Sequence, residues 1–88
     1  MILSGKEIYQ IQFVLPIQGN LETLESAAQI LNKANVKEED ADDEKTRDVD
    51  FSNEEIHFLR EMISLLNQAK KLNINGLSFY HKILNIKE

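Results

Sequence analysis

One stretch of the sequence, Ser52–Lys71, constrains the fold more than any other. It opens with Ser-Asn-Glu-Glu, which fits a capping box in which the Ser52 hydroxyl and the Glu55 carboxylate each bind a backbone N–H at a helix start. An ordinary surface helix buries an arc of roughly 100°, but two adjacent apolar stripes here cover a wider arc. They comprise Ile56, Leu59, Ile63 and Leu66, and Phe58, Met62, Leu65 and Ala69. We therefore expect a long central helix with two other elements packed on it.

Composition limits what such a chain can be. Its 88 residues fit a single small domain, and 42% hydrophobic residues are enough for a core. The net charge of −5 disfavours non-specific binding to phosphates. The absence of cysteine excludes disulfides, thiolate zinc sites and cysteine nucleophiles. We see neither a signal peptide nor an apolar run of the roughly 20 residues that span a bilayer, so we expect a cytoplasmic protein with no membrane partner.

The segment Glu7–Ile17 alternates between two faces, and that period predicts a half-buried strand. Pro16 cannot donate to a ladder, so the strand should end there or lie at a sheet edge. A short second strand is expected over Asp48–Phe51, paired with the first, with Val49 and Phe51 on one face. Two strands alone are marginal, which makes an exposed edge a candidate dimer contact.

Two further helices are predicted. One spans Leu21–Ala34 after an Asn20 cap, and its apolar residues lie within half a turn: Leu21, Leu24, Ala27, Ala28, Ile30, Leu31 and Ala34. A shorter helix is expected over Leu77–Ile86, with Asn75 as its cap. The predicted fold class is α+β, a small two-stranded sheet packed with three helices around the long central helix Ser52–Lys71. No internal repeat is apparent.

Between the predicted helix Leu21–Ala34 and the predicted strand Asp48–Phe51, the chain becomes strongly acidic. We expect a flexible acidic loop over about residues 37–47 within the single domain 1–88. An EF-hand loop beginning at Asp40 would place Lys45 where glycine is required and Phe51 where glutamate is required. The calcium motif therefore fails, and a solvated loop is the simpler interpretation.

His57 has Glu54 and Glu61 at helical spacing. Glu-x-x-His occurs in di-iron bundles, but those need two such motifs and two further carboxylates, so a surface ion pair explains this one. His81 is interpreted in the same way. The three glycines stand alone and form no phosphate-binding loop. We predict no catalytic residue, no cofactor and no metal, and hence a protein that is not an enzyme.

The leading functional hypothesis is a protein-protein interaction or assembly module that forms homo-oligomers, with a dimer as the expected state and any other protein partner unidentified. The expected strand edge and a possible groove supply the candidate partner surface: Tyr9, Phe13, Phe58, Met62 and Tyr80. Core packing explains the last three equally well.

The alternative is a nucleic-acid-associated regulator that uses a helix-turn-helix-like pair over residues 52–86. Its candidate contacts are Lys70, Lys71, His81 and Lys82. The acidic balance of the whole chain and the lack of an arginine on the last helix argue against nucleic acid. A third hypothesis has the acidic run Glu38–Glu44 occupying a basic surface on a partner.

Replacing Ile63 by Asp should unfold the domain, because an unpaired charge in the centre of the long helix would be buried. The melting temperature measures the effect. If the variant melts at the wild-type temperature, this helix is not central to the core.

Overall fold

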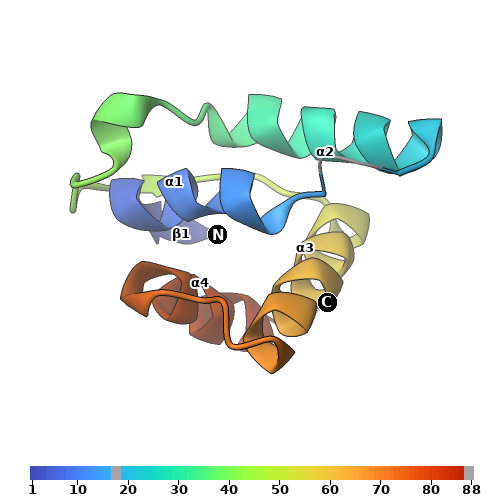
Figure 1. Ribbon diagram of the computed structural model, residues 1–88. Coiled ribbons are helices and arrows are strands. Elements are labelled where there is room, and N and C mark those ends of the chain that lie inside the picture. Colours follow the sequence, from blue (N-terminus) through green and yellow to red (C-terminus); the bar gives the residue numbers. More distant parts are fainter. Residues whose placement is uncertain (17–18, 87–88) are drawn as a thin grey trace.

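The computed structural model describes residues 1–16 and 19–86. Its elements alternate a short strand with a pair of helices (Figure 1), in the order β1 Ile2–Ser4, α1 Gly5–Val14, α2 Leu21–Ala34, the 3₁₀ helix η1 Glu38–Asp40, β2 Thr46–Asp48, α3 Asn53–Gln68 and α4 Ile74–Leu84. The predicted α+β class and the two-stranded sheet are confirmed. The described residues form four α-helices, so the prediction of three is wrong by one, and the additional helix is α1.

The start of α1 shows why the strand predicted over Glu7–Ile17 is wrong. The Ser4 hydroxyl accepts a hydrogen bond from the Glu7 backbone N–H at 3.2 Å, and the Glu7 carboxylate accepts one from the Ser4 N–H at 2.8 Å. This is a capping box, and it begins a helix inside the alternating segment. The last residue of the predicted strand, Ile17, lies outside the described residues.

Helical spacing sorts the apolar side chains of α1 into two groups. Ile8, Ile11 and Val14 recur every three residues and are buried together on the inner face. Tyr9 and Phe13, four residues apart, meet on the other side with ring centroids 5.5 Å apart in an edge-on arrangement. The same residues satisfied a period of two in the sequence, so the alternation by itself did not distinguish strand from helix.

The sheet is short and antiparallel, with Ile2 opposite Asp48 and Ser4 opposite Thr46. The Val49 N–H continues the pairing by donating to the Met1 carbonyl at 2.9 Å. A short strand thus pairs with the first strand of the chain, as predicted, but both strands lie elsewhere. β2 ends at Asp48 instead of beginning there, because the buried side chains that follow it turn into the core. These are Val49 and Phe51.

The predicted helix Leu21–Ala34 is confirmed at both ends. The Asn20 side chain accepts from the Thr23 N–H at 2.8 Å. Asn35 ends the helix in the left-handed conformation, with φ 52°, which asparagine tolerates better than most residues.

The long helix α3 begins with the predicted capping box, since Ser52 and Glu55 exchange backbone hydrogen bonds. It ends at Gln68 rather than Lys71, because Lys70 adopts a left-handed φ of 57° that no right-handed helix can contain. The last helix begins earlier than predicted, at Ile74, because the Asn73 side chain, not Asn75, accepts from a backbone N–H of the first turn.

The acidic segment lies against the start of α1. Residues 38–40 form η1, and the Arg47 guanidinium of β2 binds Asp40 at 3.0 Å and Asp43 at 2.7 Å. The Lys6 N–H of α1 donates to the Asp43 carbonyl at 2.9 Å. Part of the segment predicted as a loop therefore has regular structure, while its flexibility stays a prediction.

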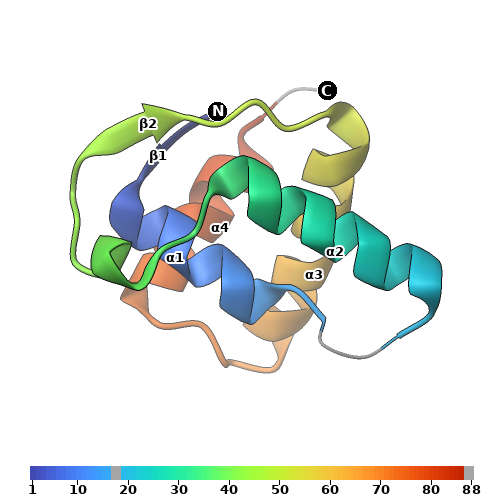
Figure 2. The ribbon, with the colours of Figure 1, turned by 90° about the horizontal axis from the view of Figure 1, so that it is seen from above.

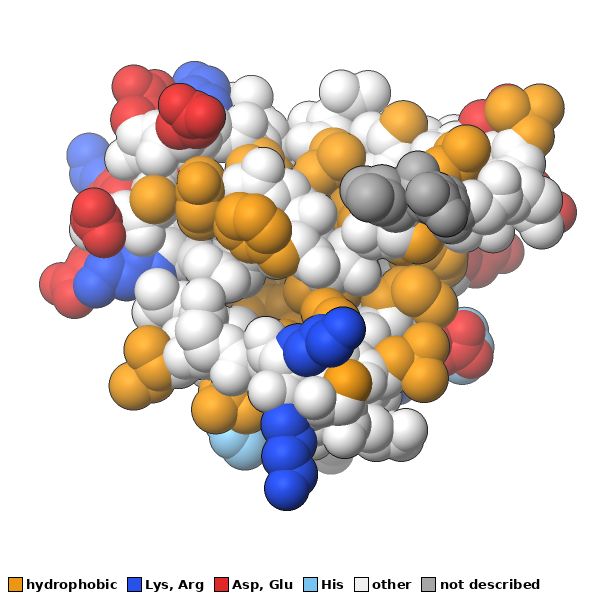
Figure 3. Space-filling view, in the orientation of Figure 1, with side chains coloured by type: hydrophobic (Ala, Val, Ile, Leu, Met, Phe, Trp, Pro, Cys, Tyr) orange, Lys and Arg blue, Asp and Glu red, His pale blue; other side chains and the backbone are white. Residues whose placement is uncertain are grey.

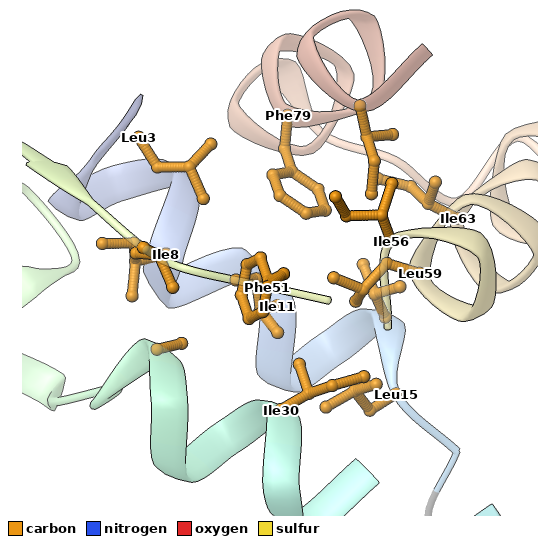
Figure 4. Packing of buried hydrophobic residues seen from close by; sticks show 14 of the residues in the cluster. Leu3, Ile8, Ile11, Leu15, Ile30, Phe51, Ile56, Leu59, Ile63 and Phe79 are labelled. Atoms are coloured by element: carbon orange, nitrogen blue, oxygen red, sulfur yellow. The ribbon is translucent and has the colours of Figure 1, made fainter. Parts of the chain in front are cut away.

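The core lies where all four helices meet β1. Figure 4 shows buried hydrophobic side chains of these elements converging there. The largest fully buried ones are Leu3, Ile8, Ile11, Ile30, Leu59, Ile63, Phe79 and Ile83. As predicted, two helices pack on α3, namely α1 and α4. The middle of the molecule, however, is occupied by α1, which lies between α2 and α4 and also contacts α3 (Figures 1 and 2).

The order strand, helix, helix occurs twice, and the two units match in detail. The segment from Leu3 to Ile11 matches that from Phe51 to Leu59, with Ser, Glu and Ile at corresponding positions: Ser4 and Ser52, Glu7 and Glu55, Ile8 and Ile56. The buried residues of the second helices have the same spacing: Ala27, Ile30 and Ala34 in α2, and Gly76, Phe79 and Ile83 in α4. The chain therefore contains an internal repeat that its few identical residues concealed.

Gly5 marks a difference between the two units and generates a prediction. A Cβ atom at Gly5 would lie 2.8 Å from the Asp43 Cβ and 2.9 Å from the Asp43 carbonyl oxygen, so Gly5→Ala would displace the segment that packs on α1. We expect the free energy of unfolding to fall by about 1–3 kcal/mol, measured by urea denaturation.

The matched control is Asn53→Ala at the corresponding, exposed position of the second unit. It should change the free energy of unfolding by about 0.5 kcal/mol or less. Equal effects of the two substitutions would contradict the close approach at Gly5.

Candidate functional site

Glu7 is a buried carboxylate at the start of α1, and it joins this helix to α4. Its Oε1 accepts hydrogen bonds from the Ser4 N–H at 2.8 Å and from the Lys82 ammonium at 2.6 Å. Its Oε2 accepts one from the Ser78 hydroxyl at 2.9 Å. Both oxygens are therefore occupied by groups from β1 and α4.

Burial alone would raise the pKa of Glu7. The hydrogen bonds from Lys82, the Ser4 backbone and Ser78 outweigh burial and hold the pKa below its ordinary value of 4.5. An ionised carboxylate with both oxygens bonded is a poor general acid or base, because it has neither a proton to give nor a free lone pair aimed at a substrate. We interpret Glu7 as a structural link.

Glu55 takes the corresponding place at the start of α3. Its Oε1 accepts from the Ser52 N–H at 2.8 Å and from the Lys33 ammonium of α2 at 2.5 Å. Burial raises the pKa of Glu55, but the bonds from Lys33 and Ser52 outweigh it and leave a lowered pKa. The lysines thus act reciprocally: each unit's second helix supplies the lysine that binds the buried glutamate of the other unit.

The two carboxylates differ at their second oxygen. Glu55 Oε2 is buried and accepts no hydrogen bond from the described residues. The α2 residue in the place of Ser78 is Gln29, which lines a cleft of about 300 Å³ between α2 and α3. The contact of α4 with Glu7 therefore leaves no free carboxylate oxygen, whereas the contact of α2 with Glu55 leaves one oxygen without a partner among the described residues.

The charged residues that line the α2–α3 cleft are Lys33, Glu54, Glu55, His57 and Glu61. His57 and Glu61, both exposed, make the predicted surface ion pair, with 3.1 Å between Nε2 and Oε1. Across residues 1–16 and 19–86, no group of three or more His, Asp or Glu side chains is placed to hold a metal ion.

A second hollow has the opposite character and lies between the end of α1 and the turn that joins α3 to α4. Its volume is about 350 Å³, and its apolar lining comes from three parts of the chain: Phe13, Val14, Leu66 and Leu72. Lys71 lies at its rim. We call this the α1 groove. Figure 3 shows apolar side chains beside and within the hollow below α1, with basic side chains next to it.

Phe13 is the most exposed apolar residue of the α1 groove, with 60% of its surface accessible. Its ring packs edge-on against the ring of Tyr9. The two aromatic rings therefore extend the apolar surface of the groove.

The N-terminal part of α2 is also uncovered. Leu21 is 73% exposed and Leu24 is 38% exposed, and the first buried residue of this helix is Ala27. Figures 1 and 2 show this end of α2 projecting past the other helices. We call the segment 21–25 the α2 arm. Helix α4 lacks this N-terminal extension, because it begins at Ile74, two residues before its first buried residue, Gly76, although Ile74 is itself 82% exposed.

The structure distributes the five predicted partner-surface residues over several places. Tyr9 and Phe13 remain together beside the α1 groove. Phe58 lines the α2–α3 cleft, and Met62 lies farther along α3 in a shallow surface hollow. Tyr80 is half-buried against the core, with its ring centroid 6.2 Å from that of His81. Of the five, Phe13 therefore lines the groove and Tyr9 contacts the Phe13 ring, whereas the other three do not line it.

The predicted nucleic-acid contacts are also divided. Lys70 and Lys71 are exposed before the start of α4, whereas His81 and Lys82 lie in its last turn. The Lys82 ammonium binds Glu7 and also donates to the Ile2 carbonyl at 3.3 Å. Its charge is therefore balanced within the protein, and the role of these residues in nucleic-acid binding stays a prediction.

Sequence reasoning missed the α2 arm as a surface, although it named Leu21 and Leu24 as apolar positions of the helix. It placed them on the apolar face of an amphipathic helix, because the helical wheel puts them on the same arc as Ile30. The signal that separates them is position along the helix, since Glu22 and Glu25 surround these leucines and the small buried residues begin only at Ala27.

No family model, no curated protein and no solved structure matches this chain. Within the part of the chain that the structure describes, no helix is both long enough and apolar enough to cross a membrane. Function is therefore argued from the geometry of the arm, the groove and the two carboxylates.

The buried carboxylates predict a dependence of stability on pH. Both have lowered pKa values, so their stabilisation is present above their ordinary value of 4.5 and is lost as the pH falls through the folded-state values. Glu7→Gln should lower the free energy of unfolding at neutral pH by about 2 kcal/mol, and Glu55→Gln by less, because one oxygen of Glu55 lacks a partner among the described residues.

Urea denaturation from neutral pH to below the ordinary glutamate value measures this. In each variant, part of the wild-type loss of stability in acid should disappear. Glu61→Gln, on an exposed carboxylate, is the control and should retain the wild-type profile. A larger effect from Glu61→Gln than from Glu7→Gln would contradict the structural role of Glu7.

Proposed function

We propose that this protein is a non-enzymatic protein-interaction module that self-associates. The observation that carries the proposal is that this small protein exposes both the leucines of the α2 arm and the apolar α1 groove. Such uncovered apolar surface marks interaction sites in small domains.

The fold leaves part of its apolar surface exposed to water. Removing apolar surface from water contributes about 25 cal/mol per Å², and a chain of 88 residues buries a modest fraction of its surface by itself. Leu21 and Leu24 contribute little to the core of the monomer. A contact that buries them together with Phe13 would add stabilisation that the isolated chain lacks.

The polar groups support a binding role rather than catalysis. The buried carboxylate of Glu7 has both oxygens bonded within the fold. Arg60 donates to the carbonyls of Ile83 and Ile86 at 3.1 and 2.9 Å and so holds the end of α4 on α3. The polar groups that are most firmly placed therefore stabilise the helix packing, and the exposed surface is left for contact with another protein.

Replacing Leu21 and Leu24 together by Ser should convert an associating protein into a monomer, because the apolar contact surface of the arm is removed. Equilibrium sedimentation measures the mass. At dilutions where both proteins are monomeric, their melting temperatures should agree within a few degrees, since neither leucine is buried.

The control is Leu65→Ser, which changes a leucine on α3 whose exposure of 57% lies between those of Leu21 and Leu24, and it should leave the association intact. A wild-type protein that sediments as a monomer up to its solubility limit would remove the self-association from the proposal. So would an associated state that persists in the Leu21→Ser, Leu24→Ser variant.

A further inference from the structure

We infer that the α2 arm of one molecule lies in the α1 groove of a second copy of the same chain. This inference rests on the proposed function and names the two surfaces that meet. Three features support it: the shapes of the two surfaces, their charges, and the position of the arm relative to its own groove.

The shapes are complementary. Leu21 and Leu24 lie three residues apart and therefore on the same face of the arm, where they form a short apolar ridge. The α1 groove is a hollow with an apolar lining of Phe13, Leu66 and Leu72, among others. A ridge of two leucines in an apolar hollow is the usual way in which an amphipathic helix binds a groove.

The charges are complementary as well. The arm carries Glu22 and Glu25, both exposed, and neither makes an ion pair with a described residue. Lys71 lines the groove and Lys70 precedes it in the chain, and both are likewise exposed and without an ion pair in the described part of the chain. In a protein of net charge −5, a basic rim beside an apolar groove selects for an acidic ridge.

The arm cannot fill the groove of its own molecule. Ile30 and Ala34 hold the second half of α2 in the core, and the arm continues that helix in a straight line past the other helices (Figure 2). A second molecule supplies what is missing. If each arm lies in the groove of the other molecule, the contact is reciprocal and closes as a two-fold dimer.

Charge reversal tests the pairing directly. One variant carries Glu22→Lys and Glu25→Lys, so that its arm is basic. The other carries Lys70→Glu and Lys71→Glu, so that its groove rim is acidic. Each should dimerise at least roughly tenfold more weakly than the wild type, because like charges now face each other in both contacts, as measured by sedimentation velocity over a dilution series.

Two rescue experiments establish that the arm and the groove meet each other. An equimolar mixture of the two variants should form a heterodimer with wild-type affinity, because both of its contacts again join opposite charges. The variant with all four substitutions should regain the homodimer. It contains every substitution of the two weakened proteins, so its recovery shows that they are folded.

The outcomes separate this inference from the proposed function. Charge-reversed variants that dimerise like the wild type, or that weaken without rescue on mixing, would overturn the arm-in-groove contact. The self-association would still stand if Leu21→Ser with Leu24→Ser gives a monomer. A wild-type monomer to which an acidic amphipathic helix of another protein binds, with loss of binding on Lys70→Glu and Lys71→Glu, would overturn the second copy as the occupant.

Discussion

The hydrogen bonds of Glu7 hold the architecture together. One carboxylate caps the first turn of α1 by binding the Ser4 N–H, and it also binds Ser78 and Lys82 of α4. Residues more than 70 positions apart in the chain are thereby fixed against each other. Since α1 lies between α2 and α4 and contacts α3, an anchored start of α1 sets the positions of all three. The buried charge of Glu7 is tolerated because both of its carboxylate oxygens accept hydrogen bonds.

The second unit repeats this device and then departs from it. Glu55 caps α3 and binds Lys33 as Glu7 caps α1 and binds Lys82. Ser78 donates to the second oxygen of Glu7. Gln29, at the corresponding position of α2, does not do so for Glu55, whose second oxygen has no partner among the described residues. Both Gln29 and Glu55 line the α2–α3 cleft. Helix α2 is also longer than α4 at its N-terminal end. The asymmetry of the molecule, and with it the exposed arm, thus arises in one helix of one unit.

Local signals in the sequence predicted the elements that local interactions decide. The caps at Ser52 and Asn20 gave the starts of α3 and α2, because a capping side chain binds the backbone three residues away whatever the tertiary context. The same signal at Ser4 and Glu7 was available and would have replaced the strand predicted over residues 7–17. It was outweighed by the alternation of that segment, which the apolar residues of a helix can also satisfy over a short stretch.

The groove could not be predicted, because it belongs to no single element. Phe13, Leu66 and Leu72 are far apart in sequence, and they line one hollow only after α1 has packed on α3 and α4. Phe13 was predicted on a strand edge and Leu66 on the apolar face of the central helix, so nothing in the sequence joined them. Tyr9 and Phe13 were placed on one face for the wrong reason, since positions four apart share a face in a helix as well as in a strand.

Substitutions in the α2 arm and in the core-facing half of α2 should affect the protein in different ways. The buried face of α2 begins at Ala27, so substitutions in the core-facing half alter the fold itself, whereas substitutions at residues 21–25 alter a surface that the fold does not need. A ridge on a continuous helix is nevertheless held in one orientation, because the core fixes the rest of that helix. In the proposed dimer such preorganisation would reduce the conformational entropy lost on association, so the two leucines and two glutamates of the arm would contribute more to binding than they would on a flexible loop.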